Sequence, residues 1–395
     1  MTHLMNTYSR LPVAFTRGRG AWLTDEQGRE YLDALAGIAV NGLGHAHPRL
    51  VAALTEQVGR LIHTSNVYRV REQEELADRL CALSGLQEVF FGNSGSEANE
   101  GALKLVRLYG HKHGEPEAQT LVMERAWHGR TLATLAATGS EKARKGFEPL
   151  PSGFIRIPYN DIGAVERAAA ADPRVRADWI EVLQGEGGIQ VADMDYLRAL
   201  RRLCDEREWL LMIDEVQSGI GRTGKWFAHQ WAGITPDVMT LAKGLGSGVP
   251  IGAVLAGGRA AGVFGPGQHG TTFGGGPLAM RAGLETLAII ESEGLMANAA
   301  EQGKRVCDGL KRELAGTAGV KEVRGMGLMI GVELDRPCGE LVKQALAAGL
   351  LINVTQDSVI RLLPPLVISA AEADQIVERL APVIRAFLAP TARAA

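Results

Sequence analysis

The sequence contains few cysteines, little net charge and no long apolar run. Of its 395 residues only four are cysteines: Cys81, Cys204, Cys307 and Cys338. Because none of them lies in CxxC spacing, they predict reduced thiols rather than a zinc site or a disulfide framework. A net charge of −3 predicts no broad basic surface for nucleic acid, and no segment is long and apolar enough for a transmembrane helix. The amino terminus lacks the basic and apolar regions of a signal peptide, so we expect a cytoplasmic protein.

Candidate metal ligands are equally sparse. His45 and His47 lie two residues apart, but no carboxylate or cysteine motif accompanies them, so we expect packing or hydrogen-bonding roles and no metal. Glycine, in contrast, is abundant. The 49 glycines cluster at 42–44, 92–95, 185–188, 244–252 and 257–276. Such clusters are typical of tight turns and of backbone that closely approaches a ligand.

Apolar periodicity predicts alternating strands and helices in the middle of the chain. Strands are expected at 89–91, 120–123, 154–157, 179–183, 210–213, 238–241 and 251–255, and helices at 49–61, 71–84, 97–108, 161–171 and 194–208. This alternation favours an α/β fold with a mostly parallel sheet and helices on both faces. The pattern changes near residue 280. We therefore expect a large domain at 51–280 and a smaller α+β domain built from 1–50 and 281–395.

Two strand ends carry the first candidate catalytic residues. Asp214 follows the apolar run 209–213, and Lys243 follows the run 238–242 and precedes a glycine-rich turn. An amine that loses water at the mouth of a buried strand has a lowered pKa and becomes a nucleophile near neutral pH. A pyridinium aldehyde cofactor requires such an amine together with a carboxylate. Each residue alone is also explained as a turn, a cap or a solvated strand end.

The segment 91–100 lies between a predicted strand and a predicted helix and is a candidate phosphate site. Gly92 and Gly95 let the backbone approach an anion, and Ser94 and Ser96 can donate hydroxyl hydrogen bonds at the helix start. The glycine spacing does not match a dinucleotide fingerprint, which argues against NAD or FAD. An ordinary helix cap is the alternative interpretation of this segment.

Further segments contain groups that can hold a ring or a carboxylate. Trp127 can stack on a flat heterocycle, and Arg130 can grip a carboxylate with its two-pronged guanidinium. Glu186 lies among glycines at a strand end, where ligands of open α/β sheets bind. Packing, a surface ion pair and a solvated turn are the alternative interpretations.

The last two candidate segments lie late in the chain. Thr271 and Thr272 offer two hydroxyls within a glycine-rich loop, which is suited to an anion or is simply a loop. Arg361 lies within an apolar stretch and, if buried, needs an anionic partner. That partner is either a structural acid or a substrate carboxylate.

Taken together, these segments resemble the class III pyridoxal-phosphate-dependent aminotransferases. The matching stretches are 41–48 (NGLGHAHP), 93–99 (NSGSEAN), 128–131 (HGRT), 184–187 (QGEG), 214–219 (DEVQSG), 242–244 (AKG), 271–275 (TTFGG) and Arg361. They cover nearly the whole chain in order, and the set is highly specific. The resemblance implies pyridoxal 5′-phosphate as cofactor, the seven-stranded sheet of fold type I in the large domain, and a homodimer with shared active sites.

The resemblance also implies roles toward the cofactor. Lys243 would bind the cofactor aldehyde as an imine and act as the general base, and Asp214 would pair with the pyridinium nitrogen. Val216 would pack on the ring face opposite Trp127, and Gln217 would bind the ring oxygen. The other cofactor-binding residues that it implies are Gly95, Ser96, Glu215 and Thr272 of the partner subunit.

For substrates, the resemblance implies N2-acetylornithine as donor and 2-oxoglutarate as acceptor. Arg130 would hold the donor α-carboxylate, helped by Thr271 of the partner subunit. Arg361 would hold the 2-oxoglutarate carboxylate, and Glu186 would neutralise Arg361 when the donor is bound. Ornithine, succinylornithine, 4-aminobutyrate and lysine-derived amines are alternative donors. A racemase or decarboxylase with the same cofactor would differ by needing no keto acid.

Three positions depart from the family pattern. Trp127 stands where the family usually has Phe, Val182 follows Glu181 where Pro is frequent, and Gly276 replaces an Asn before Pro277. None of these changes removes a reacting group. The larger Trp127 ring is expected to shift the cofactor or narrow the pocket.

Overall fold

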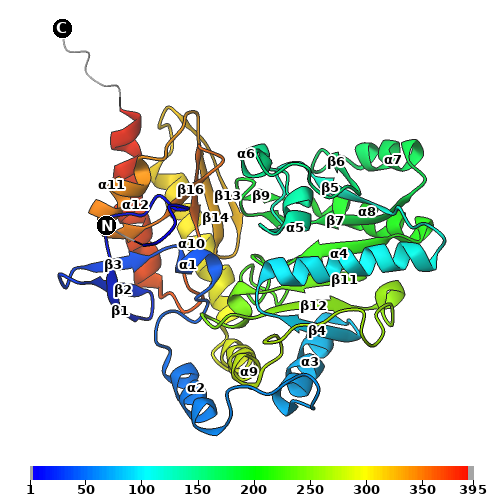
Figure 1. Cartoon of the computed structure of the whole chain (residues 1–395). Coiled ribbons are helices and arrows are strands. Elements are labelled where there is room, and N and C mark those ends of the chain that lie inside the picture. Colours follow the sequence, from blue (N-terminus) through cyan, green and yellow to red (C-terminus); the bar gives the residue numbers. More distant parts are fainter. Residues whose placement is uncertain (1–2, 390–395) are drawn as a thin grey trace.

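The computed structural model describes residues 3–389, and a seven-stranded sheet lies at its centre (Figure 1). The strand order is β4-β12-β11-β10-β7-β5-β6. The strands are β4 (Glu88–Gly92), β5 (Gln119–Met123), β6 (Phe154–Ile157), β7 (Val175–Ile180), β10 (Leu210–Asp214), β11 (Val238–Leu241) and β12 (Gly252–Ala256). Only β12 among them runs antiparallel to its neighbours. The predicted α/β fold with a mostly parallel sheet is confirmed. The prediction was possible because strands that are buried on both faces have continuous apolar sequences.

Helices cover both faces of this sheet (Figure 1). The helices concerned are α3 (Arg71–Ser84), α4 (Gly95–Lys112), α7 (Ile162–Ala171), α8 (Met194–Arg207) and α9 (Pro277–Ser292). Alternate strand residues point to opposite faces, so Met212 packs with α4 and Leu211 packs with α8. The α3 and α9 helices pack on the side of α8, under the β4 end of the sheet. Two short helices, α5 (Leu132–Ala137) and α6 (Glu141–Arg144), precede β6.

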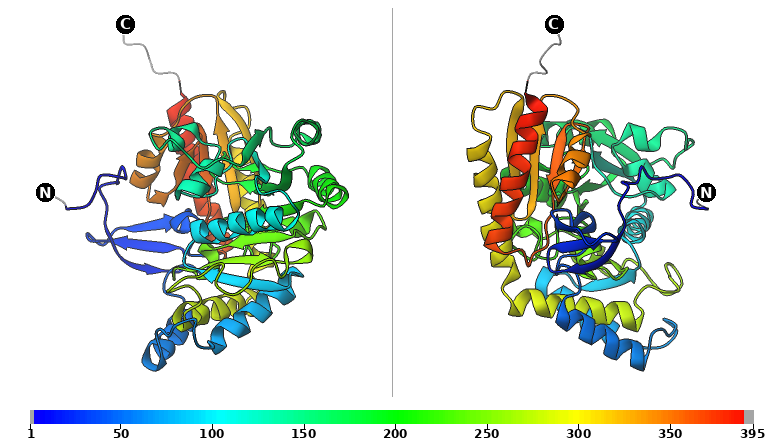
Figure 2. Two further views of the ribbon diagram at one scale, coloured as in Figure 1. Left: turned by 45° about the vertical axis from the view of Figure 1, so that its right-hand side comes forward. Right: turned by 90° about the vertical axis from the view of Figure 1, so that its left-hand side faces the viewer.

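Two smaller sheets lie beside the large one (Figure 2). The first joins β1 (Phe15–Arg19), β2 (Trp22–Asp25) and β3 (Glu30–Asp33) to β15 (Leu350–Leu351), so it combines both ends of the chain. The second contains β13 (Val320–Met326), β14 (Met329–Leu334), β16 (Asn353–Thr355) and β17 (Val359–Leu362). The helices α10 (Leu295–Glu313), α11 (Leu341–Ala347) and α12 (Ala370–Leu388) pack with these sheets, whereas α2 (Pro48–Arg60) packs on α9. None of the helices between residues 3 and 389 is long and apolar enough to cross a membrane.

One predicted strand differs in the structure. The expected strand 179–183 is interrupted, because β7 ends at Ile180 and β8 (Leu183–Gln184) pairs instead with β9 (Gln190–Val191). Apolar residues lie on both sides of this break because both parts are buried, and the buried Glu181 stands at the break itself. The turn between β8 and β9 places Glu186 beside the second small sheet.

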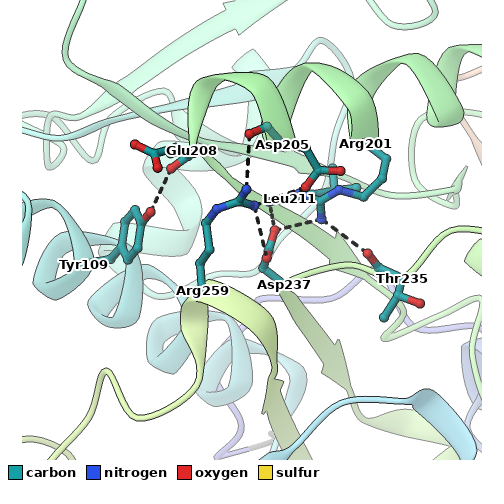
Figure 3. Close-up of polar contacts among 8 residues, drawn as sticks. All are labelled: Tyr109, Arg201, Asp205, Glu208, Leu211, Thr235, Asp237 and Arg259. Atoms are coloured by element: carbon teal, nitrogen blue, oxygen red, sulfur yellow. Dashed lines mark hydrogen bonds and ion pairs between the residues drawn. The ribbon is translucent and has the colours of Figure 1, made fainter.

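A cluster of ion pairs around the buried Asp237 holds the amino-terminal ends of β10 and β11 (Figure 3). Oδ2 of Asp237, directly before β11, accepts hydrogen bonds from Leu211 N at 2.9 Å and from Arg201 Nη1 at 2.8 Å. Arg201 and Arg259 also pair with Asp205 at 2.9 and 3.1 Å. The cluster thus stabilises the amino-terminal ends of β10 and β11, at the edge of the sheet away from their carboxyl ends.

Candidate active site

The carboxyl ends of the parallel strands border a cavity of about 330 Å³. Asp214 ends β10, Lys243 follows β11, and α4 begins shortly after β4. Parallel strands place their carboxyl ends at one edge, so residues far apart in the sequence converge there. Seven of the nine residues predicted to bind the cofactor line the cavity: Gly95, Ser96, Trp127, Asp214, Val216, Gln217 and Lys243.

Asp214 is buried and held by three neighbours. Its Oδ2 lies 2.8 Å from His128 Nδ1 and accepts a hydrogen bond from Asn99 Nδ2 at 2.9 Å. Its Oδ1 accepts from Val216 N at 3.0 Å. The His128 ring stacks on Trp179, with centroids 3.8 Å apart. These contacts fix the carboxylate toward the cavity, and the sequence prediction had assigned no role to His128 or Asn99.

Lys243 supplies the side-chain amine that lines the cavity. Burial lowers the pKa of Lys243, and the positive charge of Arg361 lowers it further, against the opposing charges of Glu186, Asp214 and Glu181. The backbone of Lys243 has a φ of +42°, which is uncommon for a residue other than glycine. Unusual backbone of this kind persists where the surrounding structure holds it, and it is frequent at active sites.

Glu181 is a second acid at the cavity that the sequence prediction did not single out. It is buried, and its Oε2 accepts a hydrogen bond from Trp127 N at 2.9 Å. Burial raises the pKa of Glu181 well above its ordinary value, and the charge of Asp214 raises it further. Glu181 follows Ile180, the last residue of β7, so it lies at the carboxyl edge of the sheet, but the apolar Val182 and Leu183 after it hid this strand end in the sequence.

The start of α4 approaches the turn after β10 closely. A Cβ on Gly95 would lie 2.7 Å from Val216 Cγ1, so only glycine fits there. Ser94 caps the helix, since its Oγ accepts from Glu97 N at 3.2 Å. The cap predicted as the alternative is therefore present. Ser96 lines the cavity, and its Oγ accepts a hydrogen bond from Arg130 N at 3.5 Å. A Cβ on Gly129 would lie 2.6 Å from that oxygen.

Trp127 and Arg130 contact each other. The guanidinium carbon of Arg130 lies 4.5 Å from the centroid of the Trp127 ring, which is a cation–π distance. Trp127 lines the cavity, whereas Arg130 is exposed and stands outside it. The aromatic ring thus separates the cavity from the arginine.

Arg361 is fully buried on β17 and is paired with Glu186. Its Nη1 donates to Glu186 Oε1 at 2.6 Å and to Gln217 Oε1 at 3.2 Å, and its Nε donates to Asn353 Oδ1 at 3.0 Å. Its Nη2 is buried without a hydrogen-bond partner in residues 3–389. The anion that a buried arginine requires is therefore the predicted acid Glu186.

Six of the predicted site residues do not line the cavity: Arg130, Glu186 and Arg361, described above, and Glu215, Thr271 and Thr272. The carboxylate of Glu215 accepts hydrogen bonds from Ser218 Oγ at 2.7 Å and from His229 N at 2.9 Å, so it stabilises the turn after β10. Thr271 Oγ1 accepts from Gly274 N at 3.2 Å within its own loop, and Thr272 is exposed. Neither threonine lines the cavity of its own chain.

The cavity residues fit pyridoxal 5′-phosphate. A buried carboxylate can hold a ring proton, and an amine with a lowered pKa can react with an aldehyde. Val216 and Trp127 offer two apolar surfaces for a flat ring. The first N–H groups of α4 have no intrahelical acceptor, and together with Ser96 they suit a phosphate.

Comparisons with known proteins agree with this chemistry. The sequence model of the family described as aminotransferase class-III matches residues 4–384. Acetylornithine aminotransferase 1 of Bordetella bronchiseptica is 66% identical over 386 residues, which is 98% of each chain. The structure of N-acetylornithine aminotransferase from Stenotrophomonas maltophilia K279a is 38% identical, covers 97% of this chain and 98% of that chain, and has a TM-score of 0.84. An ornithine aminotransferase structure from Toxoplasma gondii, with partial occupancy of PLP at its active site, is 35% identical over 97% of this chain and 92% of that chain, with a TM-score of 0.94.

Proposed function

The chain belongs to the class-III aminotransferase family, and we propose that it transfers the terminal amine of N2-acetylornithine to 2-oxoglutarate. The products are N-acetylglutamate 5-semialdehyde and glutamate. The observation that carries this proposal is the 66% identity, over nearly the full length, to a protein named acetylornithine aminotransferase. Ornithine is the alternative donor, because structures of ornithine aminotransferases superpose on this fold at 35% identity.

Pyridoxal 5′-phosphate is the proposed cofactor. When bound, its protonated ring withdraws electrons from the carbon that bears the donor's amine. Asp214, fixed by His128 and Asn99, would keep the ring nitrogen protonated. Gly95 and Ser96 would hold the phosphate together with Thr272 of the partner subunit. Trp127 and Val216 would pack on the two ring faces, and Gln217 would bind the ring oxygen.

Lys243 is the proposed general base. Its lowered pKa leaves a larger fraction of the amine uncharged near neutral pH. Lys243 Nζ would remove the proton from the donor's δ-carbon and deliver it to the C4′ carbon of the cofactor, and with 2-oxoglutarate it would carry out the same transfer in reverse. The buried Glu181 also lies near this amine, and burial together with the charge of Asp214 raises the pKa of Glu181 above its ordinary value.

Two arginines would divide the substrate carboxylates between them. Arg130, outside the Trp127 ring, would hold the donor α-carboxylate together with Thr271 of the partner subunit. Arg361 would hold a carboxylate of 2-oxoglutarate, and its pair with Glu186 would neutralise it while the donor is bound. We further propose a cytoplasmic homodimer, with a large domain at 51–280 and a small domain from 1–50 and 281–395.

A panel of amino donors with 2-oxoglutarate tests the proposal. We expect the highest kcat/KM for N2-acetylornithine, followed by ornithine, succinylornithine and 4-aminobutyrate. A preference of tenfold or more for another donor would replace the proposed substrate. Turnover without any keto acid would point instead to a racemase or decarboxylase.

A further inference from the structure

A second hollow, of about 760 Å³, lies between α4, the start of β5 and the segment 150–156. Four arginines line it: Arg107, Arg144, Arg156 and Arg174. We refer to it as the arginine cleft. None of its lining residues lines the cavity at Lys243, so it is a separate feature of the fold.

The positive charge of the arginine cleft is poorly balanced. Glu117, the one carboxylate among the lining residues, pairs with Arg174 at 2.9 Å, and Asp172 beside the cleft pairs with Arg174 at 2.8 Å. Arg107 donates to the carbonyl of Ser152 at 3.2 Å, and Arg156 donates to the carbonyl of Thr138 at 3.2 Å. Within residues 3–389, therefore, Arg107, Arg144 and Arg156 have no carboxylate at ion-pair distance.

Two guanidinium donors in the arginine cleft are buried and unpaired. Nε of Arg144 and Nε of Arg156 have no hydrogen-bond partner in the part of the chain that the structure describes. Burial lowers the pKa of Arg156, and the positive charge of Arg144 lowers it further, so the two groups lie near enough to repel each other. Partly desolvated cations without a counter-charge are costly, and a bound anion would offset that cost.

We propose that the arginine cleft binds a small multivalent anion that carries phosphate or paired carboxylate groups. Guanidinium groups present planar forked donors that match both chemistries, and several of them around one hollow favour more than one negative charge. Arg144 and Arg107 would supply the donors, and the guanidinium of Arg156 would add positive charge to the site. This site is independent of the transamination chemistry.

Calorimetric titration of the holoenzyme at low ionic strength tests this site, with pyrophosphate and citrate as the two probes. We expect Arg144→Gln and Arg107→Gln to weaken binding by about tenfold each, because each removes charge-assisted hydrogen bonds. Arg202→Gln on α8 is the matched control, since Arg202 is exposed and lines no part of the cleft. It removes the same charge and should leave binding unchanged.

The two probes also separate the sources of the anion. Tighter binding of pyrophosphate assigns the arginine cleft to phosphate compounds, and tighter binding of citrate assigns it to polycarboxylates. Binding of neither probe would overturn the proposal. So would an equal loss of affinity in all three variants, because that would reflect overall charge alone.

Discussion

Nη1 of Arg361 lies 2.6 Å from Oε1 of Glu186, and this ion pair links β17 to the turn between β8 and β9. Arg361 is fully buried, and its Nη2 has no hydrogen-bond partner in residues 3–389, so a substrate carboxylate that binds this guanidinium competes with Glu186 for it. Breaking a buried pair is costly unless a new anion replaces the old one. We therefore expect a dicarboxylate acceptor to replace Glu186 as the partner of Arg361 in one half-reaction. In the other half-reaction the pair stays intact, and the part of the donor beside it carries no charge.

Glu186→Gln removes the charge and keeps the size of the side chain. We expect kcat/KM for glutamate, relative to N2-acetylornithine, to rise by about 10- to 100-fold, because a charge-assisted hydrogen bond contributes about 1.5–3 kcal/mol. Half-reaction kinetics with each amino donor give the ratio. Glu206→Gln, at an exposed position of α8, serves as control. An unchanged ratio in Glu186→Gln would remove the switch from the mechanism.

Lys243→Ala tests the general base. We expect the variant to keep the cofactor bound without a covalent link and to lose turnover by about three or more powers of ten, since proton transfer and covalent binding are both lost. Steady-state assays and the absorption spectrum measure the two effects. Lys142→Ala, on the exposed helix α6, should behave like the parent enzyme. Near-parental turnover in Lys243→Ala would show that another group moves the proton.

Trp127→Phe restores the residue that is usual in the family and removes the larger ring under Arg130. The cation–π contact at 4.5 Å is partly exposed and contributes about 0.5–1 kcal/mol. We expect KM for the donor to rise by about two- to fivefold and the affinity for the cofactor to stay within twofold. A change in cofactor affinity with an unchanged KM would instead mean that Trp127 acts only on the cofactor ring.

Asp178 predicts a pH dependence of stability. It is fully buried in β7, both carboxylate oxygens lack a hydrogen-bond partner in residues 3–389, and burial raises its pKa to about 8. Between pH 4 and pH 8 the unfolded chain has lost this proton while the folded chain keeps it. The free energy of unfolding therefore falls as the pH rises through this window, by at most about 1.4 kcal/mol per pH unit.

Asp178→Asn removes the titrating proton and keeps the shape of the side chain. Urea unfolding at pH 5 and pH 7.5 should show a gain in stability relative to the parent that is larger by about 2–3 kcal/mol at the higher pH. The neutral substitution Asp195→Asn on the exposed face of α8 should show no such difference. An equal effect of Asp178→Asn at both pH values would mean that Asp178 is already ionised in the folded protein.

The strand-end residues of the site could be predicted from the sequence because buried parallel strands are apolar and end abruptly in polar groups. Asp214 and Lys243 are examples. Glu215 could not be placed by the same argument. Successive residues near a strand end point to opposite sides, so Asp214 and Val216 face the cavity while Glu215 turns to His229.

Contacts between segments that are distant in the chain could not be predicted from the sequence pattern. Asn99, His128 and Glu181 come from three elements, and only the fold brings them to Asp214 and Trp127. Burial of Arg361 predicted an anion, but its local sequence gave no reason to choose Glu186, which is 175 residues away. The contributions of Thr271 and Thr272 stay predictions, since both depend on a second subunit.

Reduction of the purified holoenzyme with borohydride, followed by peptide mass spectrometry, tests the assignment of Lys243 most directly. A phosphopyridoxyl group attached to the peptide that contains Lys243, together with loss of activity, is the predicted result. A modified peptide elsewhere in the chain, or a protein without any such group, would contradict the proposed active site.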